Sequence, residues 1–147
     1  MRALVLVTGV ATAVVAGAFA VFSLMVMPAL AALPGPAGVA AMQSVNRAAV
    51  RPPFLALFLG TALLCAALAV GELAGERRPL VLAGAALFLL GVFGVTVLAN
   101  VPLNDALAGA DVAWTDYLRR WTAWNTVRAL AALASAAALT VVLADGG

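Results

Sequence analysis

The stretch WTAWNTVR, residues 121–128, places an amide and a guanidinium directly before a long apolar run. Residues 129–144 carry no charge, and sixteen helical residues span about 24 Å. A bilayer's hydrocarbon core is about 30 Å thick, so Arg128 is expected about one turn inside it if Ala144 marks the far boundary. An ionisable group at that depth usually faces the bundle interior and marks a functional site.

Arginine in a water-poor pocket can stabilise an oxyanion, because a fixed positive charge acts strongly in a low dielectric. Amide side chains at the same depth are costly unless they are hydrogen-bonded. Carboxylates near the expected pocket are candidate partners of the arginine. The residues expected to carry this chemistry are Arg128, Asn125, Asn100, Asn104 and Asp105, with Asp116 as a further carboxylate.

An aromatic series precedes the arginine at helical spacing. Positions 114, 117, 121, 124 and 128 hold Trp, Tyr, Trp, Trp and Arg, which predicts one stripe on a helix. If the stripe faces inward, Tyr117, Trp121 and Trp124 would line the pocket and stack on a flat ligand. The alternative is an aromatic belt at the membrane surface with a snorkelling arginine.

Other polar groups are expected at the same end of the protein. They lie near the end of the first apolar run or in the segment after it, whereas the opposite end has mainly Glu72, Glu76 and two arginines. This asymmetry predicts a site on one side of the membrane. Met27, Gln43 and Asn46 are therefore candidate substrate-binding residues.

Composition places the chain in a membrane. Of its 147 residues, 66% are hydrophobic and 10% are charged, and the mean hydropathy is +1.15. A soluble protein of this size cannot bury so much apolar surface. The net charge of +2 is small and dispersed, which argues against nucleic-acid binding. With no histidine, one cysteine (Cys65) and no cluster of carboxylates at ligand spacing, no metal site is expected.

Four apolar stretches predict an all-α, four-transmembrane-helix bundle in a single integral membrane domain, residues 1–147. The spans are expected at about 3–33, 54–73, 80–100 and 114–144. The segment AAMQSVNRAAV, between the first two spans, predicts a short interfacial helix. Pro28 should bend or weaken the first span, and Pro102 should end the third near Asn100.

Four spans place both termini on one side of the membrane, together with the Arg77-Arg78 turn. Arginine counts do not decide the orientation, and cytoplasmic termini in a bacterial plasma membrane are our expectation because the first span often dominates.

Glycine and alanine recur at packing intervals in the first and third spans, which favours close helix contacts. The expected partners are the membrane and a hydrophobic small molecule or lipid, and a homo-oligomer is an open alternative.

Several stretches together resemble a known family. FSLMVMPAL, AAMQSVNRAAVRPPF, NVPLNDALAG and WTDYLRRWTAWNTVR are similar, in this order, to the anthrone-oxygenase-like family of small four-helix membrane proteins. The resemblance implies oxidation of a polyketide anthrone to an anthraquinone by dioxygen, without a metal or organic cofactor. In that family histidine often follows the last asparagine, and here that position is Thr126. The general base would then be Asp105 or Asp116, with a pKa raised by burial.

Two other functions remain open beside a cofactor-independent oxygenase acting on a flat phenolic or quinoid molecule. The same pocket would suit a non-catalytic carrier of a lipid or quinone. A structural subunit would instead use the tryptophans and Arg128 to dock a partner or to anchor in headgroups. A carboxylate within hydrogen-bond reach of the pocket would favour catalysis over carriage.

Overall fold

The computed structural model describes residues 1–145, and this part of the chain contains helices and connections but no β-strand. Four helices are long and apolar enough to cross a membrane, which confirms the predicted all-α, four-span class. They cover Arg2–Ala31, Pro52–Ala74, Pro79–Ala108 and Trp114–Ala144. The first span comprises α1 (Arg2–Val21), the π-helical turn η1 (Phe22–Val26) and α2 (Met27–Ala31). The third comprises α5 (Pro79–Ala86), the π-helical η2 (Leu87–Gly94) and η3 (Thr96–Asn100), and α6 (Val101–Ala108).

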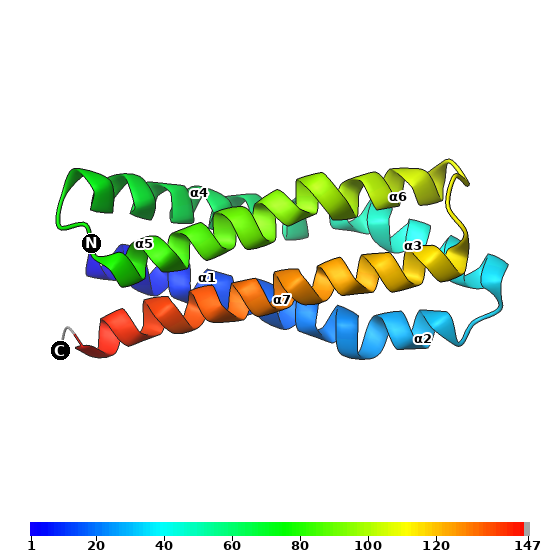
Figure 1. Ribbon diagram of the computed structural model, residues 1–147, viewed down its shortest axis with the longest axis horizontal. Coiled ribbons are helices and arrows are strands. Elements are labelled where there is room, and N and C mark those ends of the chain that lie inside the picture. Colours follow the sequence, from blue (N-terminus) through cyan, green and yellow to red (C-terminus); the bar gives the residue numbers. More distant parts are fainter. Residues whose placement is uncertain (146–147) are drawn as a thin grey trace.

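The spans form a bundle whose two ends differ. The start of α1 and the end of α7 (Trp114–Asp145) lie at one end, and the connections from α2 to α3 (Gly35–Ala49) and from α6 to α7 lie at the other (Figure 1). Helix α3 covers this second end and contacts α2, α6 and α7. Helix α7 packs along α1 and the third span, and α4 (Pro52–Ala74) packs against α1, α5 and η2. We call the end that carries α3 the loop end.

Proline begins three of these helices. Pro36, Pro52 and Pro79 lie in the first turns of α3, α4 and α5. The first turn of a helix has no intrahelical acceptor for its N–H groups, so the N–H that proline lacks is not missed there.

Pro102 does not end the third span, contrary to the expectation from sequence. Val101 is helical, with φ −63° and ψ −49°, and the helix continues to Ala108. The preceding turn η3 is π-helical, and the Val101 N–H bonds the Thr96 carbonyl five residues back. A wider turn keeps the proline ring away from the carbonyl it would otherwise strike. Pro28 follows η1 in the same way, so each proline lies two residues after a π-helical turn.

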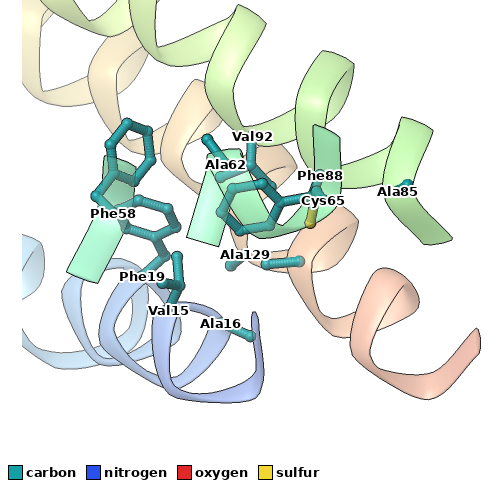
Figure 2. Packing of buried hydrophobic residues seen from close by; sticks show 11 residues of the cluster. Val15, Ala16, Phe19, Phe58, Ala62, Cys65, Ala85, Phe88, Val92 and Ala129 are labelled. Atoms are coloured by element: carbon teal, nitrogen blue, oxygen red, sulfur yellow. The ribbon is translucent and has the colours of Figure 1, made fainter. Parts of the chain in front are cut away.

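Apolar side chains from all four spans meet in the middle of the bundle. Figure 2 shows Phe19 of α1 and Phe58 of α4 pointing toward one another beside Phe88 of η2. The Phe19 and Phe58 ring centroids are 6.3 Å apart in an edge-on arrangement. Burial of this cluster gives the bundle a rigid centre from which the loop end extends.

Small residues let α7 approach the third span, as predicted for glycines in this sequence. A Cβ on Gly91 would lie 2.6 Å from the Ala131 Cβ, which is too close for any side chain. The Ser135 hydroxyl donates to the Gly84 carbonyl at 2.6 Å across the same interface. A Cβ on Gly17 would meet nothing within 4 Å, so that glycine is not needed for helix contact.

Candidate functional site

The inner face of α7 carries the site at the loop end. Tyr117, Trp121, Asn125 and Arg128 are buried, at spacings of four, four and three residues. Trp124 differs from the sequence-based expectation, because its side chain is 43% exposed. An α-helix advances about 100° per residue, and a face that includes Asn125 leaves Trp124 at its edge.

Arg128 is 5% exposed, and its charge is held by neutral groups. Nη1 donates to the Thr96 hydroxyl at 3.1 Å, and Nη2 donates to Asn125 Oδ1 at 2.8 Å. The guanidinium carbon lies 4.3 Å from the centre of the Phe19 ring and 5.3 Å from that of Trp121. No carboxylate of residues 1–144 lies within ion-pair distance, and the Nε atom has no hydrogen-bond partner in this part of the chain. Arg128 therefore carries an uncompensated positive charge at low dielectric.

Asn125 holds this guanidinium in place. Its Nδ2 donates to the Phe19 carbonyl and to the Ser23 hydroxyl, both at 2.8 Å, while Oδ1 accepts from Arg128. The Phe19 carbonyl lies in the last turn of α1, directly before η1, where the backbone hydrogen-bond pattern changes. Asn125 is not among the cavity-lining residues, so it positions Arg128 from behind.

A second polar network fixes Trp121. Asn104 Oδ1 accepts hydrogen bonds from Tyr117 Oη and from Trp121 Nε1, each at 2.9 Å. Asn100 Nδ2 donates to the Trp121 carbonyl at 3.3 Å, and its buried Oδ1 has no partner in the described part of the chain. Asn46 of α3 donates to Tyr117 Oη at 3.5 Å. The asparagines thus join α3, the third span and α7 at the loop end.

These groups border a cavity of about 580 Å³. This volume lies within the range of small-molecule sites, about 300–1,000 Å³. Arg128 is the only charged residue in its described lining, and the other polar lining residues are Thr96, Asn46, Asn100 and Asn104. Aromatic rings form much of the remaining wall: Phe19, Phe22, Phe54, Phe58, Phe93 and Trp121.

The phenylalanines and Thr96 were not among the site residues predicted from the sequence. The Phe54 and Phe58 rings are stacked with centroids 6.4 Å apart, and Phe58 and Phe93 are stacked at 5.9 Å. Phenylalanine inside a continuous apolar run gives no sign of whether it faces lipid, core or cavity. Pro28 and Pro102 were the features of the sequence that could have pointed to these residues. The π-helical turns before the two prolines supply Phe22, Thr96 and Asn100 to the cavity wall.

Several predicted site residues lie elsewhere. Asp105 is exposed on α6, and Asp116 is exposed and bonded to Arg119 at 3.2 Å, so neither carboxylate lines the cavity. Gln43 donates to the Leu107 carbonyl at 3.1 Å. Met27 and Tyr117 do not line the cavity but belong to a cluster of buried, mostly apolar side chains at the loop end. Trp124 faces outward.

The position at which the family often has histidine also faces away from the cavity. The Thr126 hydroxyl donates to the Thr122 carbonyl at 2.9 Å and lies 3.0 Å from the Ser23 hydroxyl. Thr126 and Ser23 border a separate outer groove of about 370 Å³ between the first span and α7. The absence of histidine at position 126 therefore changes that groove rather than the wall around Arg128.

Comparison with known families gives one match. The sequence pattern of the family described as anthrone oxygenase matches residues 42–138, about two thirds of the chain. The matched region contains Arg128, its partners Thr96 and Asn125, and the asparagine network. A comparison with curated proteins and another with solved structures find no match. The four-span membrane protein described above belongs to the anthrone oxygenase family.

Proposed function

We propose that this protein is a membrane-embedded oxygenase that acts, without cofactor, on a flat, apolar, phenolic molecule of the anthrone type. The observation that carries the proposal is the uncompensated guanidinium of Arg128 in the wall of an aromatic cavity. A buried positive charge without an anionic partner favours a ligand that is, or becomes, an oxyanion. Membership of the anthrone oxygenase family supports the same reaction class.

The cavity walls suit a planar ring system. Phe54, Phe58 and Phe93 present stacked rings, and the ring of Trp121, also in the wall, is held by Asn104. Aromatic faces bind flat polycyclic molecules through area burial and through offset or edge-on ring contacts. Asn100 contributes a buried carbonyl oxygen with a free acceptor position, which would receive a hydrogen bond from a phenolic hydroxyl.

The chemistry needs one anthrone and one dioxygen. Loss of a proton from the ring methylene leaves its electron pair in the ring as an enolate, whose oxygen Arg128 stabilises. The enolate passes one electron to dioxygen, and the ring radical and superoxide combine to form a carbon–oxygen bond. The peroxide takes up a proton, and loss of the second proton from the same carbon then breaks the O–O bond. The products are an anthraquinone and water.

The proposed contribution of the protein is to acidify the substrate. No carboxylate of the described chain lines the cavity, and the sequence has no histidine. Stabilising the enolate by electrostatics lowers the pKa of the bound C–H acid, so hydroxide or water can take its proton. The rate should consequently rise with pH in proportion to hydroxide until the bound substrate is fully ionised.

The test uses the detergent-purified protein and a model anthrone. Dioxygen uptake and quinone formation are measured as the rate above a protein-free control, because anthrones autoxidise. Arg128→Met should lower the protein-dependent rate by about 10²-fold or more, since it removes the group that stabilises the oxyanion. Arg120→Met is the matched control, because Arg120 is exposed on the same helix and borders no cavity wall.

Equal rates for Arg128→Met and the wild type would refute the proposed role of Arg128. A second candidate function is a carrier for a quinone or an amphipathic lipid. The lack of a carboxylate in the described lining favours it. Stoichiometric ligand binding with no protein-dependent oxidation, under conditions where the protein stays folded, would establish the carrier instead.

A further inference from the structure

Exposed side chains gather on one side of the cavity. Among its lining residues, Val50 is 67% exposed, Leu59 41%, Val97 49% and Val101 42%. Val50 and Leu59 lie just before and within the first half of α4, while Val97 and Val101 belong to η3 and the start of α6. These four apolar residues mark a mouth between α4 and the third span.

The mouth opens where these two helices separate. Helix α4 packs against α5 and η2, but the cavity occupies the space between its first half and η3. Leu59 follows the exposed Arg51 by eight residues, which places it about 12 Å deeper along the helix. Arg51 directly precedes a span of 23 residues, and an arginine at that position suits the membrane surface. The edge of the mouth at Leu59 therefore lies within the hydrocarbon region.

The chemical character of the cavity changes from an apolar mouth to a polar inner wall. Arg128 and Asn100 are almost fully buried, and both belong to the wall formed by α7 and the third span. The mouth carries only aliphatic side chains. A ligand that satisfies both regions has an oxygen-bearing flat ring at one end and an apolar substituent at the other.

We infer that the cavity receives its ligand sideways from the bilayer, and that it accepts rings bearing a long alkyl chain that extends through the mouth into the lipid. This inference rests on the proposed function, because the same cavity holds the ring. A chain that stays among lipid tails loses no hydrophobic stabilisation on binding, since lipid is as apolar as the side chains at the mouth. A site reached only from water would reject such a chain.

The test measures binding of 1-naphthol and of 4-hexadecyl-1-naphthol to the full chain in lipid nanodiscs, with ligand expressed per mole of lipid. Val97→Trp and Leu59→Trp place a large side chain in the mouth from its two sides. Leu98→Trp and Leu63→Trp are the matched controls, because these neighbours are 80% and 71% exposed and line no part of the cavity.

The wild type should bind both compounds with affinities within about threefold of each other. Val97→Trp and Leu59→Trp should each weaken binding of the hexadecyl compound by about tenfold or more, equivalent to about 1.4 kcal/mol. The two control variants should bind both compounds as the wild type does.

Two results would overturn the inference alone: wild-type binding of 1-naphthol without the hexadecyl compound, or equal effects of mouth and control variants. Failure of the folded wild type to bind either compound would overturn the proposed phenol site together with it. A folded wild type that binds both compounds, but shows no protein-dependent oxidation of an anthrone, would overturn only the proposed oxygenase activity.

Discussion

Replacing Asn125 by aspartate would place a counter-charge against Arg128 with almost no change in shape. Asn125 Oδ1 already accepts from Nη2 at 2.8 Å, so one carboxylate oxygen would occupy the same place. The second oxygen would face the Phe19 carbonyl, which now receives a hydrogen bond at 2.8 Å. The Ser23 hydroxyl can turn to donate to the new carboxylate. The fold should survive, because a new buried ion pair roughly offsets one lost hydrogen bond.

The magnitude follows from what the charge does to a bound phenol. An opposite charge nearby lowers the pKa of an acid by about 1 to 3, so Arg128 should lower the pKa of bound 1-naphthol by about 2. That corresponds to about 2.7 kcal/mol in favour of the naphtholate. Asn125→Asp should remove most of this preference, since the pair Arg128–Asp is neutral. Binding of naphtholate should weaken by about 100-fold, with a smaller effect on neutral naphthol.

The assay is an absorbance titration of 1-naphthol with pH in the presence of excess protein, together with thermal unfolding of each variant. Thr96→Val is the control, because it removes the other hydrogen bond to Arg128 without adding charge. It should weaken naphtholate binding much less than Asn125→Asp does, because the positive charge of Arg128 stays without a counter-charge. A folded Asn125→Asp protein that binds naphtholate as tightly as the wild type would refute the argument from uncompensated charge.

Two further predictions concern the ends of the bundle. Ala110 has φ 59° at the end of α6, so Ala110→Gly should raise the free energy of unfolding by about 0.5–1 kcal/mol, visible as a higher unfolding temperature. Unchanged or lower stability would contradict this reading of the turn. Arg78 bonds the buried Glu72 through its backbone N–H at 3.0 Å and through its guanidinium. Arg78→Gln should lower stability by about 2 kcal/mol because it removes the positive charge paired with that buried carboxylate, whereas Glu76→Gln should change stability little, since Glu76 is 79% exposed.

The fold and part of the site follow from the sequence for simple reasons. Charge-free runs of sufficient length have few alternatives to membrane helices, so the number and type of the spans were predictable. The polar residues in these runs were also informative. Asn100, Asn104 and Arg128 are too costly to leave in lipid, and the structure brings them to one cavity.

Periodicity alone did not assign faces to the other candidates. The spacing of Trp124 fits an aromatic stripe on one helix face, yet Asn125 occupies the inner face and Trp124 is exposed. Asp105 lies next to Asn104 in sequence, but one helical step of about 100° turns its side chain to the outside. Contact between spans, which a single sequence does not contain, decided both positions.

The π-helical turns explain why the inward-facing residues and the end of the third span could not be predicted from the sequence. Each such turn accommodates an extra residue, which rotates everything after it by about 100° relative to a regular α-helix. The face that α5 presents to α7 therefore does not continue along the same sequence positions into η3. Thr96 and Asn100 reach the cavity because of this rotation, and the helix passes Pro102 without breaking. At the equivalent place in the first span, η1 follows the Phe19 carbonyl that Asn125 binds. The two prolines thus carry structural information that hydrophobicity does not: each marks a local widening that supplies polar or aromatic groups to the wall around Arg128.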